Sequence, residues 1–236
     1  MVGTSATPQR LWSPVRVAEV TAESSLDELP ELPMHLLGEP GTVALQLRTM
    51  VRRLAMGAGL ARDGELVERV RALPGLPGLA TSPAGGTFIV GGAGWLGLCA
   101  VGVPPPGDGL PLDWMSDSLN AWFAAALAGY GVETACGRVD GAWCPGFSDI
   151  STRGRKLIGL GYRVTRAWVV MRGVMPIHPI SDADQALLCA AHALINVDVR
   201  PEASTSLAEA GGRPDLEPSD VISEWRVVET SGGVRL

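Results

Sequence analysis

Residues 143–163, WCPGFSDISTRGRKLIGLGYR, form the stretch of sequence that decides the fold. It combines glycines with Cys144, Asp149 and a lysine at position 156. Glycines beside strands let the backbone approach a ligand closely and leave N–H groups to contact it. The pattern therefore predicts a glycine-rich hairpin that carries functional side chains. The alternative is a hairpin with a solvated charged tip, since R-G-R-K is also typical of an exposed turn.

Lysine 156 is the one lysine among the 19 basic residues of the chain, and the rest are arginine. A GC-rich genome replaces lysine by arginine wherever either residue serves. A lysine that is kept against this bias is predicted to be functional, because a compact ammonium can lose its proton or contact a single oxygen. The planar arginine fork stays charged and has a different reach.

The composition excludes several classes of protein. The chain has 236 residues, of which 46% are hydrophobic and 19% charged, which is enough apolar material for a sizeable core. With a net charge of −6, binding to nucleic acid is not expected. No apolar run reaches the ~18 residues of a membrane helix, and the start of the chain lacks the apolar segment of a signal peptide. We therefore expect a cytoplasmic protein that binds no membrane.

The cysteines and histidines do not follow any metal-binding or hydrolase pattern. The four cysteines form no C-x-x-C pair, and no H-x-x-x-H or H-E-x-x-H spacing joins the three histidines. No G-x-S-x-G motif occurs. Neither a metal site nor disulfides are expected. His178 and His192 have no partner suggested by spacing and are interpreted as structural.

The order of the expected elements predicts an α+β fold with a mixed or antiparallel central sheet flanked by helices. Apolar spacing predicts helices over residues 42–58, 63–73, 117–130 and 182–195, with Ser116 and Ser181 as N-caps of the last two. Strands are expected near 132–136 and over 87–90, 95–103 and 164–177. The last three of these strands are expected to share one core sheet.

Residues 1–236 are expected to form a single domain. Its first part, residues 1–41, is interpreted as irregular apart from strand content within 11–20. Residues 181–236 are interpreted as a small C-terminal extension.

Two motifs of the 143–163 stretch resemble the biotin/lipoate A/B protein ligase family. That family pairs an S/N-D-[IL] unit with a [GR]-[RK]-K-[IL]-x-G unit, and the two units here are residues 148–150 and 155–159. Upstream, residues 81–87, TSPAGGT, are similar in order and position to the family's glycine loop. The resemblance covers about residues 64–176.

The resemblance implies transfer of a lipoyl or octanoyl group to a lysine of a lipoyl-type carrier domain. It places Lys156 and Cys144 as the catalytic residues. Lys156 would stabilise the oxygens of the acyl carbonyl or phosphate, and Cys144 would form a thioester. Lys156 is expected to point into a pocket shared with the glycine loop. The residues expected to bind substrate are Ser82, Gly85, Gly86, Thr87, Gly146, Ser148, Asp149 and Gly159.

Three activities remain open. A transferase would take an octanoyl group from a donor such as acyl carrier protein, whereas a ligase would activate free lipoate with ATP and Mg and use no cysteine intermediate. A non-catalytic lipoyl-binding relative or partner subunit is the third, because Leu79-Ala80-Thr81 stands where the family has an arginine pair. No tightly bound cofactor is expected. Biotin ligation has the least support, since no G-R-G-R-x-G-R-like loop is present. Cys144 could also be a small core residue, as free cysteines often are.

Overall fold

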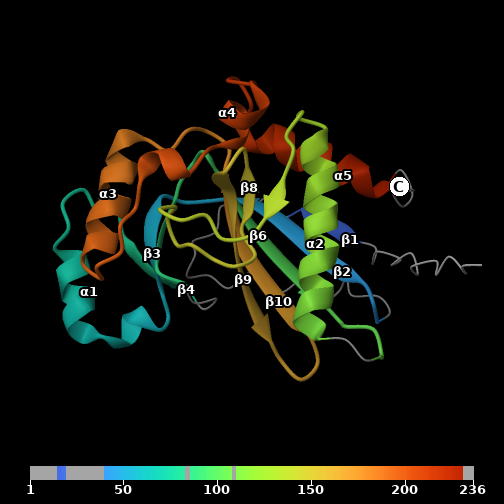
Figure 1. Cartoon of the computed structure of the whole chain (residues 1–236), viewed down its shortest axis with the longest axis horizontal. Coiled ribbons are helices and arrows are strands. Elements are labelled where there is room, and N and C mark those ends of the chain that lie inside the picture. The colour runs from blue at the N-terminus through green and yellow to red at the C-terminus, as the bar shows by residue number, and fades with distance from the viewer. Residues whose placement is uncertain (1–14, 20–39, 83–85, 108–109, 231–236) are drawn as a thin grey trace, which may run out of the picture.

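The centre of the structure is a seven-stranded mixed sheet, seen in the computed structural model of the chain (Figure 1). The structure describes residues 15–19, 40–82, 86–107 and 110–230. The strand order is β1-β2-β6-β10-β9-β8-β7, and every neighbouring pair is antiparallel except the parallel pair β1–β2. The strands are β1 Val15–Glu19, β2 Val43–Thr49, β6 Trp95–Gly102, β10 Val169–Pro176, β9 Arg155–Val164, β8 Ile150–Thr152 and β7 Ala135–Cys136. The expected α+β class with a mixed sheet is confirmed.

A second, three-stranded sheet lies beside the first and has the order β4-β3-β5. Its strands are β4 Leu79–Ser82, β3 Arg53–Gly57 and β5 Phe88–Gly91. The expectation that the strand at 87–90 shares a sheet with β6 and β10 is therefore wrong. The chain turns between β5 and β6, where Trp95 N–H donates to the carbonyl of Gly92 at 3.0 Å, and β5 pairs with β3 instead. An apolar run indicates that a strand is buried, but it does not determine which strand will pair with it.

The helix predicted over residues 42–58 is also wrong, because β2 and β3 occupy this segment. Leu45 and Leu47 of β2 pack in the main core, while Gln46 and Arg48 are buried on the opposite face of the sheet. The segment Leu45-Gln46-Leu47-Arg48 alternates apolar and polar side chains, and this two-residue period is the strand signal that the helical spacing obscured. Pairing with β6 over its whole length outweighs the helical spacing of its leucines.

The helices mostly begin and end where local signals place them. In α1, Gly64–Arg71, the Asp63 side chain accepts the Leu66 N–H at 3.1 Å. In α3, Asp182–Ala193, Ser181 caps the helix as predicted. The predicted start at Ser116 is wrong, because the second helix begins at Pro111, whose fixed φ suits the first helical position. The remaining elements are α2 Pro111–Ala128, α4 Leu207–Gly211, α5 Pro218–Thr230 and the short 3₁₀ helices η2 Leu60–Arg62 and η3 Pro201–Ala203.

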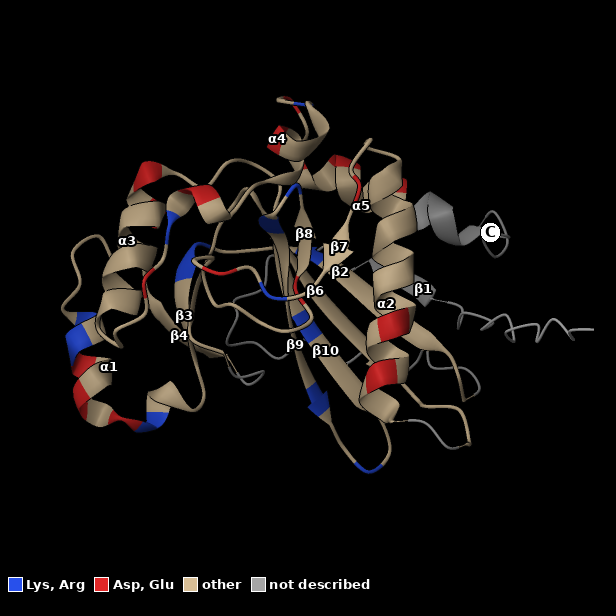
Figure 2. Ribbon diagram, viewed as in Figure 1, with Lys and Arg blue, Asp and Glu red and all other residues tan. Residues whose placement is uncertain are grey.

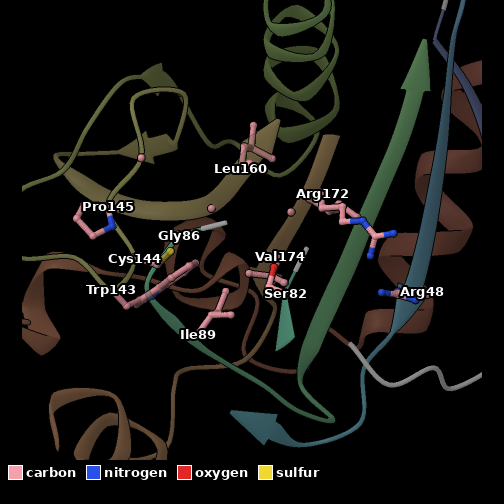
Figure 3. A pocket seen from close by; sticks show the side chains of 15 residues that line it. Arg48, Ser82, Gly86, Ile89, Trp143, Cys144, Pro145, Leu160, Arg172 and Val174 are labelled. Atoms are coloured by element: carbon pink, nitrogen blue, oxygen red, sulfur yellow. The ribbon is translucent and has the colours of Figure 1, made fainter. Parts of the chain in front are cut away.

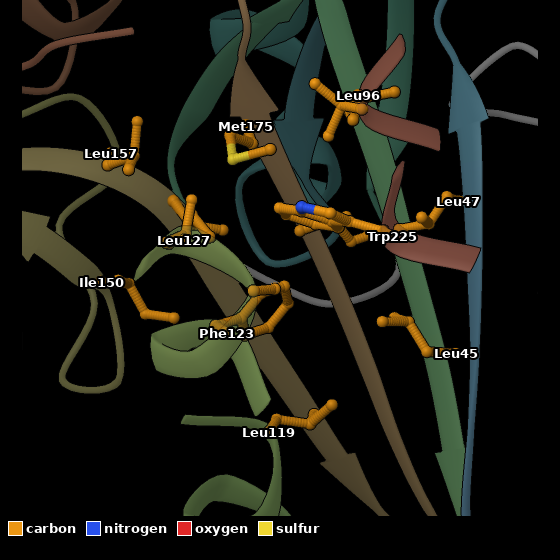
Figure 4. Close-up of a cluster of buried hydrophobic side chains, with 14 of the residues drawn as sticks. Leu45, Leu47, Leu96, Leu119, Phe123, Leu127, Ile150, Leu157, Met175 and Trp225 are labelled. Atoms are coloured by element: carbon orange, nitrogen blue, oxygen red, sulfur yellow. The ribbon is translucent and has the colours of Figure 1, made fainter. Parts of the chain in front are cut away.

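Two apolar cores lie on opposite faces of the large sheet. The main core joins the sheet to α2 and α5 and includes Phe123, Leu47 and Trp225 (Figure 4). The second core joins the three-stranded sheet to α1 and α3 and reaches the large sheet through Trp95. The central strand β6 carries no acidic or basic residue, whereas α1 carries both signs of charge (Figure 2). Among the described residues, no helix is long and apolar enough to cross a lipid bilayer.

Replacing Phe123 by alanine tests the main core. Phe123 is 0% exposed and its ring packs edge-to-face on those of Trp122 and Trp225. Phe123→Ala should lower the free energy of unfolding by about 3–5 kcal/mol, because it removes buried apolar contacts and leaves a cavity. Urea unfolding followed by circular dichroism measures this loss. Leu110→Ala is the control, since Leu110 is 68% exposed, and equal stability of the two variants would contradict the assigned core.

Candidate active site

A cavity of about 220 Å³ lies over the large sheet, on the face that does not carry α2 (Figure 3). Its position follows from strand alternation. Arg172 of β10 lines the cavity, whereas its neighbour Met171 packs in the main core beside α2. Arg48 of β2 likewise lines the cavity while Leu47 packs in the main core. The three-stranded sheet and the loop before β8 complete the walls.

Several of the residues predicted to bind substrate surround this cavity. The residues that line it are Ser82, Gly86, Gly146 and Gly159, together with the predicted nucleophile Cys144. Thr87 contacts Cys144, and Asp149 is buried beneath the loop that carries the cysteine. Ser148 is half-buried and does not line the cavity. Gly85 lies outside the described residues.

Lys156 is fully buried, but it lies behind the wall of the cavity and does not line it. Its ammonium donates to the carbonyl oxygens of Trp143 at 2.9 Å and Cys144 at 2.7 Å. It also pairs with Asp149 Oδ2 at 2.7 Å. These three acceptors match the three hydrogens of an ammonium. The side chain is withdrawn from solvent as expected, but in this state its hydrogens hold the protein's own backbone and do not face the cavity.

Asp149 joins Lys156 to the surrounding backbone. Its carboxylate accepts the N–H of Gly146 at 2.7 Å and that of Leu160 at 3.2 Å. Burial raises the pKa of Asp149 and lowers the pKa of Lys156, while the attraction between the two opposes both shifts. A Cβ at position 146 would lie 3.0 Å from Asp149 Oδ1, so a glycine allows this close contact. The pair fixes both ends of the loop that carries Cys144.

The Trp143 ring forms one side of the cavity and covers the lysine. The ammonium lies 4.0 Å from the centre of the ring, within the range of a cation–π contact. A Cβ at position 159 would lie 2.6 Å from the same ring, so the glycine in β9 makes room for the indole. This explains why the motif has a glycine at position 159, in the same strand as Lys156.

Cys144 sits in a strained backbone conformation, with φ of 40°. Its Sγ accepts the N–H of Thr87 at 3.2 Å. A Cβ at position 86 would lie 2.5 Å from this sulfur, and Gly86 has φ of +84°, so two observations require glycine there. The Thr87 N–H is a hydrogen-bond donor directed at this sulfur, and the Lys156 ammonium holds the carbonyl of the same residue. Burial raises the pKa of the other three cysteines, Cys99, Cys136 and Cys189.

His192 is a member of this site that the sequence interpretation left as structural. Its Nε2 lies 2.9 Å from Thr87 Oγ1 and accepts the N–H of Cys144 at 3.3 Å. Its Nδ1 lies 2.8 Å from the carbonyl oxygen of Leu188. Burial lowers the pKa of His192. The signal that could have found it is its position on the apolar face of α3, four residues after Leu188, where a buried histidine needs partners.

Two arginines that carry no motif also line the cavity. Arg48 stands opposite Gly97 in the β2–β6 pair, and Arg172 stands opposite Cys99 in the β10–β6 pair. Both extend from strands, on the opposite side of the cavity from Cys144 (Figure 3). The cavity therefore combines apolar walls, a thiol and guanidinium groups. Within the part of the chain that the structure describes, no group of three or more His, Cys, Asp or Glu residues could hold a metal ion.

By sequence, the chain is similar to a curated protein. That protein is the octanoyl-[GcvH]:protein N-octanoyltransferase of Geobacillus kaustophilus, which is 25% identical over 159 residues. The match takes in 64% of this chain, which spans only 56% of the length of that relative. No protein-family model matches the chain.

Solved structures share the fold. The bi-partite lipoate protein ligase of Thermoplasma acidophilum, studied with its E2 lipoyl domain, superposes with a TM-score of 0.59 at 14% identity, covering 94% of this chain and 83% of that one. P. falciparum LipL1 in complex with lipoate superposes with a TM-score of 0.56 at 11% identity, covering 92% of this chain and 61% of that one. The sequence match and the shared fold agree with the resemblance of the motifs around Lys156 to the biotin/lipoate A/B protein ligase family.

Proposed function

We propose that this protein is an acyltransferase that moves an octanoyl or lipoyl group to a lysine of a lipoyl-type carrier domain, with the acyl group held on Cys144 as a thioester. One observation carries the proposal. The Cys144 sulfur faces a cavity, accepts a backbone N–H from Thr87, and belongs to a residue whose carbonyl is held by the Lys156 ammonium. A thiol that faces a cavity and is held by neighbouring groups supports a nucleophilic role, and a core cysteine would not need these contacts.

The reaction consists of two acyl transfers. The Cys144 thiolate attacks the acyl carbonyl of the donor, and the donor's leaving group departs with a proton as the thioester forms. The amine of the acceptor lysine then attacks the thioester carbonyl, loses a proton, and releases Cys144. The N–H of Thr87 stabilises the thiolate before the first step and after the second.

The cavity walls suit an aliphatic acyl chain. Ile89 and Val174 line it together with the Trp143 ring, and Leu98 and Leu160, whose side chains belong to the main core, also reach it. A chain that enters these walls loses its contact with water, which favours binding roughly in proportion to the apolar area buried. With the chain inside the cavity, its carbonyl end would lie at the Cys144 sulfur.

The names of similar proteins suggest donors and acceptors. The G. kaustophilus relative is named for octanoyl-[GcvH] as donor, and the T. acidophilum ligase was studied with an E2 lipoyl domain. We propose lipoyl-domain proteins as partners, with octanoylated GcvH or octanoyl acyl carrier protein as the donor. Lipoate and octanoate are proposed as the acyl groups.

An ATP-dependent ligase is the second candidate function. Arg48 and Arg172 bring positive charge to the cavity, and guanidinium groups suit the carboxylate of free lipoate or the phosphate of an acyl-adenylate. In that reaction ATP, bound with Mg, would activate lipoate, and Cys144 would carry no acyl group. The two candidates therefore differ in whether an acyl-cysteine forms.

Intact mass spectrometry of the protein after incubation with each donor tests the main proposal. Octanoyl-GcvH or octanoyl acyl carrier protein should add one octanoyl group that hydroxylamine removes, because the bond is a thioester. Cys144→Ser should abolish this adduct. Cys136→Ser and Cys99→Ser should leave it intact, the first being an exposed and the second a buried control.

Two other results of the same incubations would contradict the proposal. Lipoate with ATP and Mg that yields an adenylate, without an adduct on Cys144, would establish the ligase reaction. If no donor reacts and no adenylate forms, while lipoate still binds, the protein is a non-catalytic relative. Introducing the family's arginine pair before Ser82 would then be the first substitution to test.

Lys156→Arg tests the requirement for an ammonium. A planar guanidinium cannot reproduce three bonds to Asp149 and to the Trp143 and Cys144 carbonyls from one nitrogen. We expect transfer to the acceptor lysine to fall by about 100-fold or more per folded molecule. Single-turnover rates, corrected by circular dichroism for the folded fraction, measure this. Arg163→Lys in the exposed part of the same strand is the control, and wild-type turnover of Lys156→Arg would contradict the role of the ammonium.

A further inference from the structure

We propose that His192 is a positioning residue that sets the reactivity of the Cys144 thiol through the backbone of Cys144 and the side chain of Thr87. The inference rests on the proposed function only in taking Cys144 as the nucleophile. One ring nitrogen of His192, Nε2, contacts two groups that lie close to the Cys144 sulfur. These are the N–H of Cys144 itself at 3.3 Å and Thr87 Oγ1 at 2.9 Å.

The hydrogen bonds define the tautomer of the imidazole. The Leu188 carbonyl, 2.8 Å from Nδ1, can only accept, so Nδ1 carries a hydrogen. The Cys144 N–H can only donate, so Nε2 presents its lone pair. The Thr87 hydroxyl then donates to the same lone pair. The histidine is neutral and acts as an acceptor, so it orients its neighbours and does not remove the proton of the thiol.

Both neighbours of Nε2 control the sulfur. Thr87 donates its own N–H to Sγ at 3.2 Å, so holding the Thr87 side chain also holds this donor in place. Cys144 has a φ of 40°, a strained conformation that persists only where its surroundings enforce it. The N–H of Cys144 is held by His192 and its carbonyl by Lys156. The cysteine is therefore held from both sides.

Packing fixes the ring that makes these bonds. His192 is fully buried in α3, and its ring meets that of Phe88 edge-on with centres 5.4 Å apart. Phe88 belongs to β5, the strand that directly follows Thr87. The helix, the glycine loop and the cysteine loop thus meet at one imidazole, although 48 residues separate Cys144 from His192.

A pair of amide variants separates this role from simple packing. The amide of glutamine reaches the position of Nε2, so His192→Gln keeps an acceptor for Cys144 and Thr87. The amide of asparagine reaches only the position of Nδ1, so His192→Asn keeps the bond to Leu188 and loses the acceptor. The rate of alkylation of Cys144 by iodoacetamide, followed by peptide mass spectrometry, reports the thiol directly and needs no acyl substrate.

We expect His192→Asn to slow alkylation of Cys144 by about tenfold, as for loss of the Thr87 N–H bond to the reacting thiolate, and His192→Gln to restore the rate to within about twofold of the wild type. The exposed Cys136 is the internal control and should react at an unchanged rate in all proteins. Wild-type reactivity of Cys144 in His192→Asn would overturn the proposal. So would an equal loss in both variants.

Labelling of the buried Cys99 reveals whether a variant has unfolded. If His192→Asn exposes Cys99, Thr87→Val and Thr87→Ser carry the same comparison. The valine variant should slow the reaction of Cys144 and the serine variant should restore it, and equal rates would overturn the proposal. If His192 controls alkylation but no donor acylates Cys144, positioning by His192 stands and the proposed acyl transfer fails. If a donor acylates Cys144 but the two amide variants react at the same rate, the proposed acyl transfer stands and positioning by His192 fails.

Discussion

The ion pair between Lys156 and Asp149 is the constraint on which the rest of this site depends. Both side chains are almost fully buried, at 0% and 1% exposure, so each charge must be satisfied by protein groups alone. The ammonium does this with two backbone carbonyls, and the carboxylate does it with two backbone N–H groups. Since these groups belong to the cysteine loop and to β9, satisfying the charges fixes the loop on the strand.

Close packing around the pair accounts for the glycines of the motif. Gly146 lets the loop pass against Asp149, Gly159 lets the Trp143 ring lie on β9, and Gly86 lets the glycine loop reach the sulfur of Cys144. Any larger residue at these positions would meet an atom of the site at 3.0 Å or less. The glycines therefore do not serve only to make the hairpin flexible. They allow three backbone segments to converge on one cavity.

The site is assembled from parts of the chain that lie far apart in sequence. The lysine hairpin supplies the ion pair, the segment before β5 supplies the N–H to the thiol, and α3 supplies His192. Arg48 and Arg172 come from two further strands of the large sheet. Cys144 can keep its strained backbone conformation because several rigid elements hold it at once. The side chains that hold Cys144 in place therefore differ from the two arginines that line the cavity opposite it.

The sequence by itself determined whatever depends on neighbours along the chain. The helix cap at Ser181, the hairpin around Lys156, the α+β class and the motifs around Lys156 could all be read from short segments, because their interactions span only a few residues. The tertiary structure decided the rest. It made β2 a strand despite its helical spacing, placed β5 in the second sheet, turned the ammonium of Lys156 away from the cavity, and brought His192 to Cys144. Each of these depends on pairing, burial or hydrogen bonding between distant segments, and such contacts exist only once the chain is folded.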